Sequence, residues 1–594
     1  MVIAPWIKSI ELRGGQRLEL GQTTVLALVG PNNGGKTNFL KQLRSQLYGD
    51  EVNEQPADKG LIAKIEVEWG AEAGGWAERL LAYANKRWPP QDEYYQPDLP
   101  SSYKNRYHAY RAEDIRELAN DSTKLGPFID AFVRWDEPHS RIDESEKQQL
   151  NRAVSAAVSL ARSNADLTRV SDLFFEIFEE HLSVYDLREG EIGFVLGEEP
   201  CGASRSTSGL SRETKEFMRN APKLWFQGSG YRNVFGLLAR MESDQRPIVL
   251  VDEPEAFLHP QQSAKLGNIL GGLCQDENKQ LICATHDRHF LTGLAQGIGE
   301  KLQVARLSFN GTGSARTYNA TQVPLEFWRD IRDQSRARYS TVFESLFCDE
   351  VVLVESENDA LFYQEAIEHS LAKRETQTSG SVERLFIPVG GNAEFAPMSK
   401  LVRSLGPRVV VLGDVDLVAH ADRFESTVRA LVDHLPSRVS ELRNEIESIY
   451  RANLDLGRSD IDQHRCQLKD ALEKAPEEAI APEIKDLMHK LLEDLERKQK
   501  TNNRNMLQQR MARDANLRSR NEDVVKAVKQ LLDLLVPINL VLVPQGEIEH
   551  FDTDLLKEVG KQAWVHEALK KDVHKNHNVQ SFVETIQSLS LATG

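Results

Sequence analysis

The sequence predicts an α/β protein of two domains, each interrupted by a helical insertion. Two observations support this prediction. Short apolar runs that end in glycine-rich or acidic turns and lead into helical patterns occur in two separate parts of the chain. In addition, 594 residues exceed what one hydrophobic core normally organises. We expect a first domain over 1–320 with an insertion at about 76–222, a linker over 321–345, and a second domain over 346–594 with an insertion at about 419–530.

Composition is typical of a globular protein that does not enter a membrane. Apolar residues make up 40% of the chain and charged residues 27%, and no window approaches the roughly 18 uninterrupted apolar residues of a membrane helix. The N-terminus, MVIAPWIKSIELRGG, lacks the basic and apolar stretches of a signal peptide, so we expect a cytoplasmic protein. The cysteines show no paired metal-ligand spacing, and we expect reduced thiols at 201, 274, 283, 348 and 466.

The strongest motif is a phosphate-binding loop in VLALVGPNNGGKTNFLKQL, residues 25–43. A short apolar strand leads into G-x-x-x-x-G-K-[ST], from Gly30 to Thr37, and a helical pattern follows. Backbone N–H groups of such a loop turn toward the phosphates of ATP at a helix N-terminus. Lys36 would contact the β- and γ-phosphates, and Thr37 would ligate Mg²⁺. The other loop residues expected at the nucleotide are Gly30, Asn32, Asn33, Gly34 and Gly35.

Two later strands end in residues that complete an ATPase site. PIVLVDEPEAFLHP, residues 247–260, places Asp252 at a strand end, where its carboxylate can hold Mg²⁺. Glu253 can orient the attacking water. QLICATHD, residues 280–287, ends in His286, which we expect to sense the γ-phosphate; a core or surface histidine is the alternative.

These three segments resemble the ABC/SMC-type ATPases, in which two heads sandwich ATP. The resemblance implies that each head supplies a signature serine to the nucleotide of the other. In QGSGYRNVFGLLARM, residues 227–241, the candidates are Ser229 and Gly230, and an ordinary helix cap is the alternative role of Ser229. A homodimer or higher homo-oligomer, assembled through the ATPase heads, is therefore expected.

The C-terminal half repeatedly places acids after apolar strands. LVESEND, residues 353–359, follows the run VVLV, and similar runs precede two further pairs of acids. In a parallel sheet these strand ends face one crevice, and crowded carboxylates favour Mg²⁺ or Mn²⁺ there. Solvated loop acids are the alternative. The residues concerned are Glu355, Asp359, Asp414, Asp416, Glu547 and Glu549.

The order of a glutamate, a glycine-rich turn and Asp-x-Asp resembles the Toprim domain. The resemblance implies metal-dependent phosphodiester cleavage with Glu355, Asp414 and Asp416 as catalytic metal ligands. Asp359 matches the acid that closes the glutamate motif, whereas Ser356 stands where Gly is usual. PQGEIEHF resembles a later OLD-type segment that adds another acid, Glu547 or Glu549.

Basic segments are rare in a chain whose net charge is −17, which argues against non-specific coating of nucleic acid. RKQKTNNRNMLQQRMARDANLRSR, residues 497–520, could track a phosphate backbone, and a solvated helix face is the alternative. KKDVHKNH, residues 570–577, offers three lysines that could stabilise the cleaved phosphate, namely Lys570, Lys571 and Lys575.

An ATPase head fused to a C-terminal Toprim domain resembles the OLD-family nucleases, including Gabija-type, retron-associated and PARIS-like antiphage proteins. The resemblance implies an ATPase that is also a metal-dependent endonuclease of DNA or RNA, acting in antiphage defence. The second hypothesis is an ATPase sensor or scaffold whose degenerate Toprim domain controls a partner defence protein. A topoisomerase or primase is disfavoured, because the sequence offers no room for a tyrosine-bearing cleavage domain and no Cys/His cluster.

Overall fold

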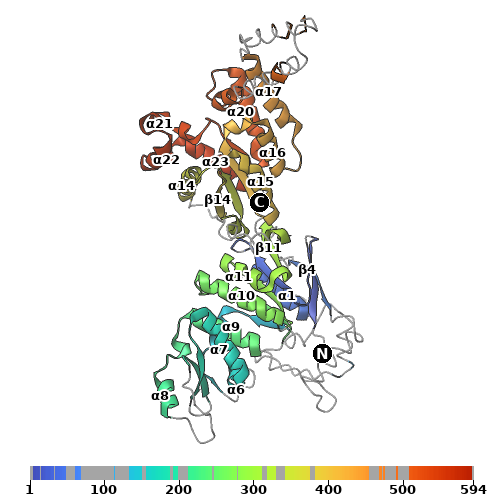
Figure 1. Ribbon diagram of the computed structural model, residues 1–594, viewed down its shortest axis with the longest axis vertical. Coiled ribbons are helices and arrows are strands. Elements are labelled where there is room, and N and C mark those ends of the chain that lie inside the picture. The colour runs from blue at the N-terminus through green and yellow to red at the C-terminus, as the bar shows by residue number, and fades with distance from the viewer. Residues whose placement is uncertain are drawn as a thin grey trace. The chain divides into compact units, whose positions relative to one another are not determined.

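The computed structural model separates the chain into two compact units, Met1–Asp349 and Glu350–Gly594 (Figure 1). Each unit is described by itself. Apart from single positions near 111 and between 467 and 492, the structure describes residues 5–13, 15–32, 34–48, 61–68, 133–149, 156–187, 191–198, 212–243, 246–276, 278–310, 317–328, 341–374, 382–453 and 507–591.

The first unit is organised by a six-stranded sheet with the strand order β12-β11-β3-β10-β9-β5. Five strands run parallel, and β12 is antiparallel to β11 at one edge. The central strands are buried along their whole length, as parallel strands covered on both faces should be. The strands are β3 Val25–Val29, β5 Val133–Asp136, β9 Ile248–Asp252, β10 Gln280–Ala284, β11 Leu302–Asn310 and β12 Thr317–Gln322.

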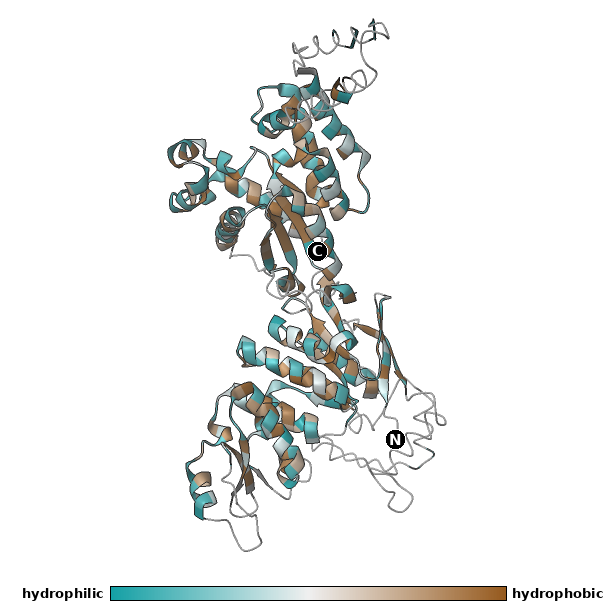
Figure 2. Cartoon of the chain, viewed as in Figure 1, coloured by the Kyte–Doolittle hydropathy of each residue, from teal (hydrophilic) through white to brown (hydrophobic). Residues whose placement is uncertain are grey.

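Both faces of this sheet are covered. One face packs against α1 (Lys36–Tyr48) and a small antiparallel sheet of β1 (Trp6–Leu12), β2 (Arg17–Glu19) and β4 (Ile62–Glu68). The hydrophobic strands of the sheets appear brown in Figure 2. The helices that complete the core of this unit are α9 Ser229–Ser243, α10 Pro260–Asp276 and α11 Arg288–Ile298.

The insertion expected to be helical over 76–222 also contains strands. Residues 133–136 form β5 at the edge of the main sheet, where they pair with β9. A separate antiparallel sheet has the order β6-β8-β7. Amphipathic helical spacing is obvious in the sequence, whereas these short strands gain stability only from partners distant in sequence, which explains the error. The elements are β6 Gln148–Gln149, β7 Leu182–Leu187, β8 Glu191–Leu196, α5 Pro138–Glu144, α6 Ala156–Arg162, α7 Asn164–Phe178 and α8 Arg212–Asn220.

Part of the segment expected as a linker belongs to the first unit. A 3-10 helix, Thr341–Leu346, buries Phe343 against Trp328 with ring centroids 5.7 Å apart. Arg306, on β11, donates a hydrogen bond of 2.5 Å to the carbonyl oxygen of Cys348. These contacts place the end of the first unit at Asp349 rather than near residue 320.

The second unit is built on a four-stranded parallel sheet with the order β14-β13-β15-β16. The four strands coincide with the apolar runs identified in the sequence. They are β13 Glu350–Val354, β14 Arg384–Pro388, β15 Arg408–Asp414 and β16 Leu540–Val543. Even-numbered residues of β13 and β15, such as Val352 and Val410, join a core with α14, α22 and α23. The other face contacts α15, which packs against α16 (Figure 1).

The helices of the second unit include those of its insertion. The elements that the structure describes in the 419–530 segment are helices joined by turns, and α17 packs against α20. The bounds are α14 Glu357–Arg374, α15 Phe395–Leu405, α16 Ala421–Leu431, α17 Ser437–Asn453, α20 Glu522–Leu535, α21 Thr553–Val559, α22 Lys561–Lys570 and α23 His577–Leu591.

A buried ion pair joins the first three strands of this sheet and generates a stability prediction. The fully buried Glu350, on β13, accepts a 2.5 Å bond from Arg384 Nε on β14 and lies 3.8 Å from Arg408 on β15. Glu350→Ala leaves two partly buried guanidinium groups without this counter-charge, so we expect the free energy of unfolding to fall by about 3 kcal/mol. Denaturant unfolding of the whole chain measures it. Arg438→Ala, at an exposed position of α17, is the control, and an equal loss in both variants would contradict the prediction.

Candidate functional site

The phosphate-binding loop connects β3 to α1 in a conformation that requires glycine. Gly30 has a φ of 137°, and a Cβ atom there would lie 2.2 Å from the carbonyl oxygen of Leu307. Gly35 has a φ of 88° immediately before α1. The N–H of Gly34 donates to Pro31 and closes the turn. Asn32 is exposed, and Asn33 lies outside the described residues.

Lys36 and Thr37 lie at the N-terminus of α1 and connect the loop to β9. The buried ammonium group of Lys36 donates to the carbonyl oxygens of Gly30 and Pro31 at 2.8 and 2.9 Å. The hydroxyl of Thr37 donates to Asp252 Oδ2 at 2.9 Å. A hydroxyl and a carboxylate at this separation form the oxygen donor set that Mg²⁺ prefers.

The strand ends beyond Asp252 bring Glu253 and His286 together. Glu253 adopts a left-handed φ of 45°, and its N–H donates to the carbonyl oxygen of Ala284 at 3.0 Å. His286 Nε2 lies 3.9 Å from Glu253 Oε1, and both side chains are partly exposed. Burial raises the pKa of Asp252, while the Thr37 hydrogen bond lowers it. The two acids therefore have different environments, one enclosed and one open to water.

A third acid of this segment, Glu255, was not identified from the sequence. Its carboxylate accepts bonds from Thr285 Oγ1 at 2.7 Å and from the His286 N–H at 3.0 Å. Full burial raises its pKa to about 7. Glu255 thus fixes the strand end that carries His286. The second acid of DEPE is the sequence signal that could have suggested this role.

Arg141 is another residue that the sequence did not reveal. This fully buried side chain comes from α5 and donates to the carbonyl oxygens of Asp252 and Glu253 at 3.0 and 2.7 Å. Its Nε donates to Asn233 Oδ1 on α9 at 2.6 Å. Because these carbonyls belong to the turn after β9, Arg141 holds the backbone of the acidic residues in place.

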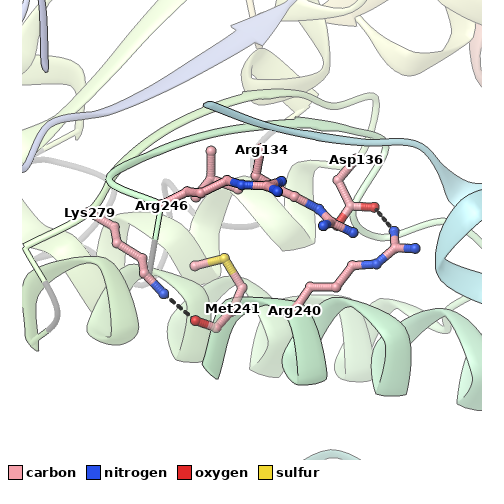
Figure 3. Close-up of a pocket in the computed structure, with 7 residues that line it drawn as sticks. Arg134, Asp136, Arg240, Met241, Arg246 and Lys279 are labelled. Carbon is pink, nitrogen blue, oxygen red and sulfur yellow. Dashed lines mark hydrogen bonds and ion pairs between the residues drawn. The ribbon is translucent and has the colours of Figure 1, made fainter. Parts of the chain in front are cut away.

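A second buried cation, Arg240, belongs to α9 and lies beside Asp136 (Figure 3). It forms a 2.6 Å ion pair with Asp136 at the end of β5. Lys279 donates to the carbonyl oxygen of Met241 at the other end of the cluster. The space between these groups leaves no room for a molecule the size of water. This cluster is a packed ion-pair network and not a ligand site.

Ser229 is exposed and is the first residue of α9. The residue before it, Gly228, therefore occupies the capping position. Gly230 packs closely, since a Cβ atom there would lie 2.7 Å from the carbonyl oxygen of Phe257. Whether Ser229 contacts a nucleotide stays a prediction.

In the second unit, Glu355 and Asp414 meet at the C-terminal end of the parallel sheet. Glu355 follows β13, and Asp414 ends β15 beside it. The N–H of Asp414 donates to Glu355 Oε1 at 3.4 Å. Asp416 Oδ1 accepts from Asn392 at 3.4 Å, and Asn392 in turn accepts from Arg423 at 2.8 Å.

Burial and mutual repulsion change the ionisation of these acids. Burial, followed by the charge of Asp416, raises the pKa of Glu355 to about 7. Burial, followed by the charges of Glu355 and Asp359, raises the pKa of Asp414 to about 9. The pKa of Asp416 is raised as well, chiefly by burial. Such a cluster favours a bound cation or bound protons.

Ser356 and Asp359 form a capping box at the start of α14. The N–H and hydroxyl of Ser356 donate to Asp359 Oδ2 at 2.9 and 2.8 Å, and Ser356 Oγ accepts from the Asp359 N–H at 3.3 Å. Ser356 has no positive φ, so the turn does not require glycine here. One oxygen of Asp359 is therefore engaged by its own helix.

The loop after β16 adds Glu547, Glu549 and a lysine. Glu547 caps a 3-10 helix, Ile548–Phe551, and Glu549 is buried within it. Lys561 Nζ, at the start of α22, lies 3.0 Å from Glu547 Oε2. Although burial lowers it, the Glu547 bond and the charges of Glu549 and Asp414 raise the pKa of Lys561 overall, which keeps it cationic.

Lys561 is thus the lysine that the structure brings to the acids. Sequence reasoning offered three later lysines, but each pairs with an acid elsewhere: Lys570 with Glu567, Lys571 with Glu558 and Lys575 with Asp572. Lys561 was missed because its position depends on how α22 packs rather than on a local motif.

The acids share one end of the sheet without forming a closed coordination sphere. Within the described part of the chain, no three His, Cys, Asp or Glu side chains are gathered closely enough to hold a metal ion as they stand. The donor set of carboxylate oxygens nevertheless fits Mg²⁺ or Mn²⁺ by chemistry.

Two protein-family models match the chain. An AAA-domain family, described after the AbiEii toxin of type IV toxin–antitoxin systems, matches residues 86–292. The Toprim domain of proteins like the overcoming lysogenization defect (OLD) protein matches residues 346–416, which include Glu355, Asp414 and Asp416. The chain therefore carries an ATPase domain followed by an OLD-like Toprim domain, and the resemblance inferred from the motifs is confirmed.

Solved structures with a low-level similarity to this chain include three SMC heads. An SMC head bound to the C-terminal winged-helix domain of ScpA is 12% identical, with a TM-score of 0.30, and 53% of this chain matches 97% of that one. The Pyrococcus furiosus Smc head bound to the C-terminal domain of ScpA is 13% identical, with a TM-score of 0.29, covering 56% and 100%. The Thermotoga maritima SMC head is 14% identical, with a TM-score of 0.26, covering 54% and 98%.

The predicted α/β class, an ATPase head followed by a Toprim domain, is confirmed by the two sheets and the family matches. A search of curated proteins finds no match to the chain. None of the described helices combines the length and apolar character needed to cross a bilayer.

The buried Glu255 generates a pH-dependent prediction. Its pKa in the folded state, about 7, lies above the ordinary value of 4.5. The folded state therefore holds this proton more tightly than the unfolded state, and the associated stability is complete below pH 4.5 and is lost as pH rises through 7. Glu255→Gln keeps an acceptor for Thr285 but does not titrate. Between pH 5 and 8 the parental chain should lose up to roughly 3 kcal/mol relative to the variant.

Unfolding of both chains at pH 5, 6, 7 and 8 measures this difference. Parallel stability curves for parent and variant across that range would show that Glu255 is already ionised in the folded protein.

Proposed function

Because the chain has the ATPase–Toprim organisation of the OLD family, we propose that it is an ATP-regulated, divalent-metal-dependent nuclease that acts in antiphage defence. The observation that supports this most directly is the convergence of Glu355, Asp414 and Asp416 at one end of the second sheet. Their raised pKa values reflect a site that stabilises positive charge. Lys561 lies at the same edge. Carboxylates beside a lysine suit the cleavage of a phosphodiester, DNA or RNA.

Each side chain of the second unit has a distinct role in this proposal. Glu355, Asp414 and Asp416 would hold Mg²⁺ or Mn²⁺, with the free oxygen of Asp359 and with Glu547 or Glu549 completing the ligand set. When bound, such ions lower the pKa of the attacking water and neutralise charge on the phosphate. Asn392 positions Asp416 through their hydrogen bond. Lys561 would stabilise the negative charge of the phosphate oxygens.

The first unit would bind and hydrolyse ATP. The loop around Lys36 would hold the phosphates, and Thr37 with Asp252 would hold Mg²⁺. Glu253, exposed at the strand end beside His286, would orient the attacking water. Exposure of Ser229 at a helix start supports a role for it across a head-to-head interface. We propose a cytoplasmic homodimer or higher homo-oligomer in which ATP at the heads controls nucleic-acid cleavage.

A specific observation favours a second candidate, an ATPase scaffold that controls a partner defence protein. One carboxylate oxygen of Asp359 accepts hydrogen bonds from Ser356 in the capping box. Among the described residues, the acids are not gathered closely enough to hold a metal ion as they stand. In this alternative the Toprim domain keeps its fold, and the acids of Glu355 and Asp414 stay protonated. Incubation with plasmid DNA and an RNA pool, with Mg²⁺ or Mn²⁺, separates the two candidates: no cleavage of either substrate favours the scaffold.

Asp414→Asn should separate cleavage from ATP binding. Loss of this carboxylate removes several kcal/mol of charge stabilisation, so we expect cleavage to fall by more than about 100-fold while nucleotide binding is unchanged. Lys36→Ala should abolish nucleotide binding, because the ammonium group that would contact the phosphates is lost. Gel assays of cleavage and fluorescent-nucleotide titrations measure the two effects. The matched control is Asp433→Asn, an acid whose side chain is 94% exposed. Cleavage by Asp414→Asn at the parental rate would refute the metal assignment.

Lys561→Ala tests the cationic member of the site. If Lys561 stabilises the phosphate during reaction, kcat should fall about 10- to 100-fold while Mn²⁺ still binds, as titration calorimetry would measure, and Lys561→Arg should recover part of the rate. Lys557→Ala, an exposed lysine paired with Asp554 on α21, is the control. An unchanged kcat in Lys561→Ala would show that the lysine only offsets the charge of Glu547.

A further inference from the structure

We propose that a basic pocket in the insertion of the second unit binds the sugar–phosphate backbone of the nucleic-acid strand beside the scissile bond. This inference rests on the proposed nuclease function and names how that site would hold its substrate. The cavity measures about 790 Å³. Four arginines and a single aspartate line it, and the residues that carry the argument are Arg510, Arg513, Arg518, Arg520, Tyr450 and His550.

Three segments distant in sequence build the pocket. Tyr450 comes from α17, the arginines come from residues 510–520, and His550 comes from the loop after β16. The Tyr450 side chain is 6% exposed, and burial raises its pKa to about 12. The pocket is thus a constructed concavity with one buried wall, rather than an exposed helix face.

The charges of the lining are not balanced within the pocket. Arg513 forms two bonds with Asp514, at 3.0 and 3.1 Å, so the only acid of the lining is already paired. No described carboxylate forms an ion pair with Arg518 or Arg520. An anion is therefore the ligand that the guanidinium groups of Arg518 and Arg520 lack.

The pocket and the catalytic acids share one loop, residues 544–550. The N–H of Val415, between Asp414 and Asp416, donates to Gly546 O at 3.1 Å. On the other side, the N–H of Leu517, among the arginines, donates to Pro544 O at 3.0 Å. Glu547 lies between these anchor points, and its N–H donates to His550 Nδ1 at 3.1 Å. A ligand held by the arginines therefore lies next to the acids.

Phosphodiester groups fit this lining better than other anions do. Guanidinium groups bind phosphate oxygens in a planar, bidentate manner, and several phosphates in succession would use several arginines. The volume matches that of a nucleotide-sized ligand. In a chain with a net charge of −17, this concentration of arginine also gives a strand one favoured place to bind. Because the pocket shares the 544–550 loop with the acids, a substrate strand is a better ligand for it than a free nucleotide.

The test is a double substitution, Arg518→Ala with Arg520→Ala, in an Asp414→Asn background that does not cleave. Fluorescence anisotropy with single-stranded DNA, single-stranded RNA and duplex DNA of one sequence, from 50 to 300 mM salt, measures binding. We expect affinity to fall about tenfold or more at 150 mM salt for at least one of these probes, and the slope of log K against log salt to fall by roughly two, about one for each arginine.

The matched control is Arg429→Ala with Arg438→Ala, two exposed arginines of α16 and α17 that do not line the pocket. Thermal unfolding and ATP binding confirm that all variants are folded. Parental affinity and salt slope in the Arg518/Arg520 variant, with parental unfolding, would overturn the proposal. A second outcome would also overturn it. In a Lys36→Ala chain, ATP would bind through Arg518 and Arg520 and would not compete with the nucleic-acid strand.

The outcomes also separate this inference from the proposed activity. If the parental chain cleaves no nucleic acid but binds a strand through Arg518 and Arg520, the nuclease proposal fails and the pocket stands. If cleavage occurs and binding is indifferent to both arginines, the nuclease stands and the pocket assignment fails.

Discussion

The repulsion between half-buried carboxylates at the end of a parallel sheet is the constraint to which the second unit is adapted. Pairing of β13 with β15 places Glu355 next to Asp414 despite the repulsion between their carboxylates. Neither can move far, because the strands before them are buried along almost all of their length. The fold therefore supplies compensating positive charge from outside the sheet: Lys561 from α22, and Arg423 through the amide of Asn392. Such a site costs stability until a cation or protons enter it.

The first unit solves a related problem with backbone contacts. Asp252 and Glu253 also end a buried strand, and Glu253 has a left-handed backbone conformation. The guanidinium group of Arg141 binds the carbonyl oxygens of both residues and so fixes the turn without pairing directly with the acids. The acid side chains remain available for a metal ion and water. The positive charge of Arg141 thus stabilises the backbone of this site without forming an ion pair with the side chains of Asp252 and Glu253.

Sequence reasoning identified the strands and the acids that follow them, because burial on both faces leaves continuous apolar runs. The same reasoning missed Arg141 and Lys561, whose roles depend on helices packing across long sequence separations. It also interpreted 76–222 as helical, since the short strands of β7 and β8 are specified by each other rather than by local pattern. Ser356 was different: the spacing S-x-x-D is a local capping signal, and it explains why LVESEND ends in Asp359. Roles of the candidate ligands themselves remain predictions, because convergence of acids does not specify coordination.

The loop at 544–550 determines how the acids and the arginines of the second unit are placed relative to each other. Gly546 adopts a φ of 118° and lies so close to the His550 ring that a Cβ atom would approach Nδ1 to 2.8 Å. This turn lets the loop present Glu547 to the acids and His550 to the arginines within four residues. Its backbone is bonded both to Val415 and to Leu517, so the loop joins the turn that carries the acids directly to the segment that carries the arginines. The acids proposed to bind metal and the arginines proposed to bind phosphate carry opposite charges and would attract each other. The turn holds the two groups on opposite sides of the loop, which is the separation that the proposed binding of one strand by both groups requires.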